Sequence, residues 1–122
     1  MAKTVTAAAC GCVLALAATA AHAGSYDAMV GQWAWQGFTI EVTKGGDHGV
    51  SAEVVDGPKN VGMQMIRSEL ERKDGAFVGQ VKHPANGKVY NTRISRKGGD
   101  AWKLNGCTDG GACASGVFKR VD

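Results

Sequence analysis

Residues 31–43 read GQWAWQGFTIEVT, and this stretch decides the fold class. Trp33 and Trp35 stand at alternate positions, and after a break at one glycine the apolar residues again occupy every second position. A period of two puts apolar side chains on one face of a β-strand and polar side chains on the other. The stretch therefore predicts two half-buried strands, over residues 29–36 and 38–43.

The same alternation continues along the chain in short runs separated by clusters of Gly, Pro, Asn and Asp. Between residues 61 and 73 the apolar residues also fit helical spacing, but charged residues at alternate positions before Asp74-Gly75 favour a strand that feeds a hairpin turn. Eight strands leave no room for helical crossovers, and closure of the sheet would remove its exposed edges. The sequence thus predicts an all-β fold, a small antiparallel eight-stranded up-and-down barrel. Its six further strands are expected over residues 50–54, 61–73, 76–82, 88–97, 102–104 and 115–121.

The interior of such a barrel is just wide enough to be filled by side chains or to hold one small ligand. We expect a pocket near or below the low end of the roughly 300–1,000 Å³ typical of ligand sites. We expect this pocket to open near Trp35, Tyr90 and Trp102, which are therefore the predicted ligand-binding residues. A short acyl chain or a small aromatic molecule would fit there. The bulky candidates for the interior are Trp35, Phe38, Ile40, Val42, Met63, Phe77, Tyr90, Ile94, Trp102 and Leu104.

Length and charge limit the classes of function. The chain has 122 residues, enough for one small domain. Its formal net charge is only +3, and the basic residues form no dense stripe. Nucleic acid is therefore not an expected partner.

The N-terminus has the pattern of a secretory signal peptide. A basic residue is followed by an apolar run over residues 7–21 and by Ala21-His22-Ala23, with small residues at the two positions that signal peptidase reads. The run is too short to span a bilayer. Cys10 is an alternative site of lipid attachment, but the apolar run continues past it. We predict a cleaved signal over residues 1–23, and a single periplasmic domain over 24–122 without a membrane span.

Two cysteines remain after this cleavage, Cys107 and Cys113. In an oxidising compartment an even number of cysteines favours a disulfide, and the flexible glycine-containing segment between these two can close. Five intervening residues suit neither a zinc knuckle nor a redox-active Cys-x-x-Cys site. The pair is therefore predicted to form a structural disulfide.

The Gly31-Gln32-Trp33 opening of the first strand, with Phe118-Lys119-Arg120 near the end of the chain, resembles the lipocalin-like (calycin) arrangement. The resemblance implies that Gly31, Trp33 and Arg120 close one end of the barrel. In that arrangement the basic residue packs over the tryptophan.

A second resemblance rests on the pattern GxxxxPxxGKxY over residues 79–90, followed by WxLxG over 102–106. This pattern is similar to that of a family of exported bacterial proteins, the domain-of-unknown-function family 2147. The resemblance covers residues 31–122. The family implies a small exported barrel and carries no established activity.

No combination of residues typical of catalysis stands out. His48 and His83 are predicted to lie exposed in turns, outside any metal-ligand spacing, and no serine has the context of a catalytic nucleophile. Met63 and Met65 could form a soft copper site with one of these histidines, although filling the core is the commoner role of methionine. We expect no catalytic residue, no metal and no cofactor.

These observations favour a non-enzymatic exported protein. The function we expect is binding of a small apolar ligand or of an envelope protein by a monomer. The alternative is a periplasmic protease inhibitor built on a small β-barrel.

Overall fold

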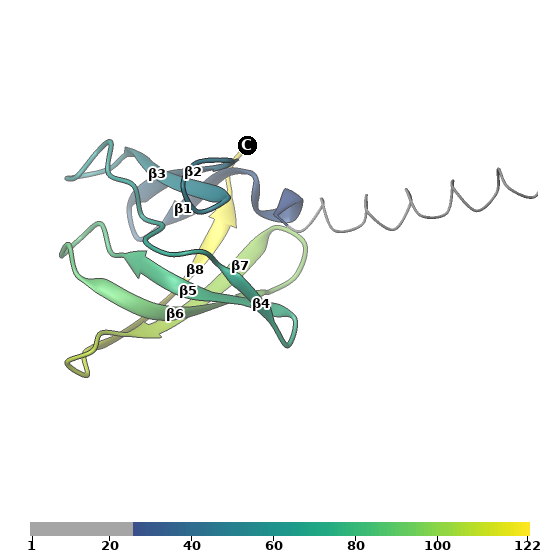
Figure 1. The fold of residues 1–122 in the computed structure, drawn as a ribbon. Helices are drawn as coiled ribbons and strands as arrows, with labels where there is room; N and C mark the ends of the chain where they lie inside the picture. The colour runs from purple at the N-terminus through teal and green to yellow at the C-terminus, as the bar shows by residue number, and fades with distance from the viewer. Residues whose placement is uncertain (1–25) are drawn as a thin grey trace, which may run out of the picture.

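A computed structural model describes residues 26–122 and contains one sheet of eight antiparallel strands. The order across the sheet is β3-β2-β1-β8-β7-β6-β5-β4. The sheet curls, so that β1, β2 and β3 lie over β5, β6 and β7 (Figure 1). The predicted all-β antiparallel fold is confirmed and is consistent with a small up-and-down barrel. The elements are a 3-10 turn η2 (Asp27–Met29), β1 (Gly31–Trp35), β2 (Phe38–Lys44), β3 (Val50–Asp56), β4 (Glu71–Lys73), β5 (Ala76–Lys82), β6 (Val89–Arg96), β7 (Ala101–Cys107) and β8 (Cys113–Arg120).

The predicted signal segment, residues 1–23, lies outside the described residues, and so does Cys10. Within residues 26–122, no helix has both the length and the apolar character that a membrane crossing requires.

Two hairpins close through two-residue turns of the kind that suits the twist of antiparallel strands. Asp74-Gly75, between β4 and β5, has φ angles of 51° and 81°, as the sequence predicts for this turn. Gln36-Gly37 joins β1 to β2 with φ angles of 51° and 87°. Positive φ at both central residues matches the right-handed twist of the flanking strands.

The open side of the curled sheet is spanned by the chain between β3 and β4. The amide of Met65 donates to the carbonyl of Ala52 on β3 (2.7 Å), and the carbonyl of Met65 accepts from the amide of Lys82 on β5 (2.7 Å). The prediction of a strand over residues 61–73 is therefore largely wrong, because only Glu71–Lys73 forms one. The residues around Met65 hydrogen-bond to β3 on one side and to β5 on the other. This segment therefore closes the barrel without forming a regular strand.

The core lies inside the curl. Of the ten interior candidates from the sequence, nine are buried, and Met63 is half-buried against the same cluster. Met65, Ile66 and Leu70 are also buried. These three come from the irregular spanning segment, where no alternation marks the inward positions.

The predicted disulfide is present between Cys107 and Cys113. The two residues face each other in the register of β7 and β8, at the end of that hairpin. The bond therefore closes a short loop and links no distant parts of the chain.

Reduction of this disulfide is expected to lower the free energy of unfolding by no more than about 2–3 kcal/mol, because a loop of about seven residues restricts the unfolded chain only modestly. Urea unfolding of the oxidised and reduced protein measures the difference. The Cys107→Ser/Cys113→Ser double variant, which cannot reoxidise, should match the reduced protein. Complete unfolding on mild reduction at room temperature would contradict the expectation.

Candidate ligand-binding site

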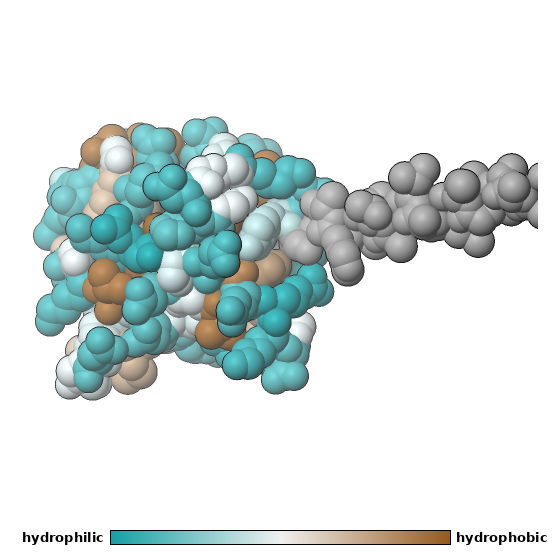
Figure 2. Space-filling view, viewed as in Figure 1, coloured by the Kyte–Doolittle hydropathy of each residue, from teal (hydrophilic) through white to brown (hydrophobic). Residues whose placement is uncertain are grey.

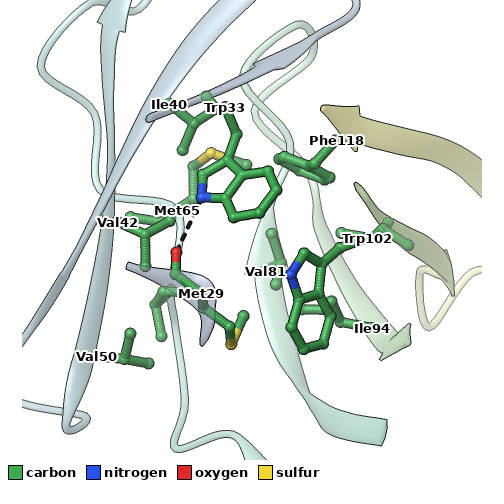
Figure 3. Close-up of a pocket in the computed structure, with 13 residues that line it drawn as sticks. Met29, Trp33, Ile40, Val42, Val50, Met65, Val81, Ile94, Trp102 and Phe118 are labelled. Carbon is green, nitrogen blue, oxygen red and sulfur yellow. Dashed lines mark hydrogen bonds between the residues drawn. The ribbon is translucent and has the colours of Figure 1, made fainter. Parts of the chain in front are cut away.

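A cavity of about 50 Å³ lies inside the curl of the sheet. Thirteen residues line it, contributed by seven strands, by η2 and by the spanning segment (Figure 3). None of them is charged. Their inward positions follow from the strand alternation, which puts Trp33, Ile40, Trp102 and Leu104 on the buried face of the sheet.

Trp33 lines this cavity, and Arg120 packs over it. Trp33 is 2% exposed, and its indole Nε1 donates to the carbonyl of Met29 (2.9 Å). The guanidinium carbon of Arg120 lies 4.3 Å from the centre of a Trp33 ring, within the range of a cation–π contact. The predicted packing of the basic residue over the tryptophan is confirmed in this geometry.

Hydrogen bonds fix the guanidinium of Arg120 in this position. Its Nη1 donates to the carbonyl of Val30 (3.0 Å), and Nη2 donates to the carbonyl of Ala28 (3.2 Å). Gly31 has a φ of 136°, and a Cβ atom there would collide with the same guanidinium. The structure thus brings together all three residues that the lipocalin-like resemblance places at the closed end.

The three residues expected at the mouth of a pocket are not brought together. Trp102 lines the main cavity, whereas Trp35 and Tyr90 line a second one of about 10 Å³. That volume is close to the minimum for one water molecule. The second cavity also includes His83, whose ring centre lies 4.7 Å from that of Trp35.

Two of the three indole groups have an unpaired N–H. The Nε1 atoms of Trp35 and Trp102 are buried and have no hydrogen-bond partner among residues 26–122. A Cβ atom at Gly116 would collide with the indole nitrogen of Trp35, so this nitrogen lies against the backbone of β8. Trp102 lines the main cavity (Figure 3), but its indole nitrogen is shielded by neighbouring atoms, as that of Trp35 is. An unpaired buried donor costs about 1–3 kcal/mol, so each needs a physical explanation.

His83 is not exposed, contrary to the sequence-based prediction. It is 8% exposed, and its Nδ1 accepts a hydrogen bond from the amide of Ala85 (3.0 Å). The turn that contains it folds against the loop after β3, where Asn60 Nδ2 donates to the carbonyl of Pro84 (2.6 Å). Burial lowers the pKa of His83 below its ordinary value of 6.5. A neutral imidazole, with its proton on Nε2, suits both the burial and the bond from Ala85.

The free energy of unfolding should therefore fall as the pH drops below about 6.5, because the unfolded chain binds a proton on His83 that the folded protein does not. The loss should level off below the folded-state pKa. The His83→Asn variant keeps an acceptor for the amide of Ala85 and does not titrate. It should lose less stability between about pH 7.5 and about pH 5 than the parent protein in urea unfolding. Equal pH dependence in the parent and in the His83→Asn variant would contradict the assignment.

Met65 is 1% exposed and lines the apolar cavity, which is the core-filling role favoured for methionine. Within residues 26–122, no three His, Cys, Asp or Glu side chains gather closely enough to hold a metal ion.

The visible face of the molecule is mostly hydrophilic, with hydrophobic residues in scattered patches (Figure 2). Among the described residues, the large apolar side chains that are exposed are single valines, Val61, Val89 and Val121. Isolated apolar residues of this kind are normal on a protein surface. The continuous apolar lining of the interior is thus the feature best suited to an apolar ligand.

Fold and cavity together define a small all-β protein with a partly open apolar space inside its curled sheet. Comparisons of the chain with protein-family models, with curated proteins and with solved structures find no match. The resemblance to family 2147 therefore stays a prediction.

Proposed function

We propose that this chain is an exported, non-enzymatic binding protein that holds a small apolar ligand inside its barrel. The observation that carries the proposal is the cavity of about 50 Å³ with its uncharged, almost wholly apolar lining. An apolar lining of this kind offers water almost no hydrogen-bond partners and favours an apolar occupant.

The size of the cavity limits the ligand. Its volume is a few times the roughly 10–15 Å³ needed for one water molecule, and far below the roughly 300 Å³ of a drug-sized site. A short alkyl group, a small ring or the end of a longer chain would fit, and a haem-sized cofactor would not. Met29 and Met65 line the space, and their flexible thioether side chains can adapt to occupants of slightly different shape.

Titration with fatty acids of increasing length tests this function. Two tryptophans line the cavity, so their fluorescence reports an occupant. The affinity should rise over the first few carbons and then level off once the cavity is full. No fluorescence response to any chain length would contradict the proposal, as would tight binding of haem inside the barrel.

A cavity-filling variant sharpens the test. Ala52 is 7% exposed and lines the cavity, so Ala52→Leu should fill most of the space and abolish the fluorescence response. Ala34 lies on β1 between the two inward tryptophans and is only half-buried. The matched variant Ala34→Leu should bind as the parent does. Equal binding by the two variants would place the ligand elsewhere.

We also propose that the protein reaches the periplasm after removal of residues 1–23. The support is the signal pattern, with small residues at Ala21 and Ala23. The mass of the protein purified from its own cells should equal that of residues 24–122 less two hydrogens. An intact N-terminus or an acylated Cys10 would contradict it. Native mass spectrometry of the same sample would reveal a retained ligand.

A further inference from the structure

The curled sheet is not hydrogen-bonded all the way round, because β3 and β4 are its two outer strands. The spanning segment bonds to β3 as far as Ala52, whose carbonyl accepts from the amide of Met65, and the amide of Arg67 already donates to β5. Among residues 26–122, no backbone hydrogen bond joins the Val50 end of β3 to β4. We call this break the seam. Val50 is 1% exposed and lines the main cavity, so the seam lies beside that cavity.

The side chain of Tyr26 fills the seam. Its hydroxyl donates to the carbonyl of Leu70, immediately before β4 (3.0 Å). On the β3 side the ring lies against Gly49, where a Cβ atom would be 3.5 Å from it. The ring centre is 5.4 Å from that of Phe77, which in turn lies 6.0 Å from Trp102 in the wall of the cavity. Tyr26 therefore contacts both sides of the seam without lining the cavity itself.

The chain after Tyr26 is held firmly, whereas Tyr26 is held lightly. The three consecutive carbonyls of residues 28–30 accept hydrogen bonds from the side chains of Trp33 and Arg120. The side chain of Tyr26 makes a single hydrogen bond and is half-buried. The ion pair of its neighbour Asp27 is exposed, and exposed pairs contribute little. Opening of the seam therefore costs one hydrogen bond and the contacts of one ring, and residues 28–30 need not move.

We infer that Tyr26 is the gate of the cavity, and that the apolar ligand enters and leaves through the seam between β3 and β4. This inference rests on the function proposed above and adds how the site is reached. A gate residue controls the rates of binding and release. It leaves the affinity unchanged, because it does not touch the occupant in the closed state. A residue of the cavity wall would change the affinity as well.

Xenon is the probe for the test, since it is a single atom that enters dry apolar cavities. Titration of the mature protein followed by ¹²⁹Xe NMR gives both the Kd and the rate of exchange between free and bound xenon. Tyr26→Phe keeps the ring in the seam and removes only the hydrogen bond to Leu70. The exchange rate should rise about fivefold, the effect expected of one typical hydrogen bond, while the Kd stays the same.

Tyr90→Phe is the matched control, because it makes the same chemical change at the other tyrosine of the chain. The hydroxyl of Tyr90 accepts from Asn86 Nδ2 (2.9 Å), and the residue lines the second, smaller cavity. This variant should exchange xenon at the rate of the parent. Tyr26→Ala also removes the ring and should exchange xenon faster than Tyr26→Phe. If Tyr26→Ala does not fold, the comparison of the two phenylalanine variants still decides the test.

The possible failures are distinct. If xenon binds but Tyr26→Phe exchanges it at the rate of the parent, the inference is overturned and the proposed function remains. The same holds if Tyr90→Phe accelerates exchange equally, or if Tyr26→Phe changes the Kd as much as the rate, as a wall residue would. If xenon does not bind the parent protein, the proposed function falls, and the inference falls with it.

Discussion

Replacement of Trp33 by alanine is expected to lower the free energy of unfolding by about 3–5 kcal/mol, the usual cost of truncating a buried tryptophan. The indole is 2% exposed, donates to the carbonyl of Met29 and lies under the guanidinium of Arg120. All three contributions disappear together in the variant. A small domain has only about 5–15 kcal/mol of stability in total, so the protein should become marginal.

Urea unfolding followed by circular dichroism measures this loss. A loss below about 1.5 kcal/mol would show that Trp33 is not the closing residue of the barrel. Trp33→Phe is the milder comparison, because it keeps a ring under the guanidinium and removes the bond to Met29. A double-mutant cycle of Trp33→Leu with Arg120→Met should give a coupling energy of about 0.5–2 kcal/mol for the stacked pair.

Gly116→Val is expected to have the second large effect, a loss of about 3 kcal/mol or more through overpacking. A Cβ atom at this position would collide with the indole of Trp35. That indole cannot move aside, because it is 2% exposed and is stacked on Phe118 with 4.8 Å between ring centres. His83 packs against it as well.

Gly99 provides the matched control for this substitution. A Cβ atom at Gly99, in the turn between β6 and β7, would have no neighbour within 4 Å, and the residue does not have a positive φ. Gly99→Val should therefore change the free energy of unfolding by no more than about 0.5 kcal/mol. Similar losses for the two valine variants in urea unfolding would contradict the packing of Trp35 on β8.

Most of the fold could be predicted from the sequence, because alternation and turn residues are local signals. The run of alternate apolar residues from Trp33 to Val42 gives two strands and their inward faces. The turn at Asp74-Gly75 requires residues that accept positive φ. The spanning segment around Met65 could not be predicted, because its backbone bonds to β3 and β5 in turn and leaves no period to detect.

The candidate site was less accessible to sequence reasoning. The pairing of Trp33 with Arg120 followed from a family resemblance, and the contact is present. His83 stands beside a proline in a turn, which favours exposure, yet tertiary packing of that turn buries it. The unpaired N–H of Trp102 depends on which atoms surround it in space. No local pattern of residues could indicate it.

A crystal structure of the mature protein under xenon pressure would show whether the apolar interior accepts a small ligand. Xenon enters dry apolar cavities. We expect a xenon atom between Trp33, Val81 and Trp102, and none there in the Ala52→Leu variant. A parent structure with no xenon in this cavity, or with side chains that leave no space there, would contradict it.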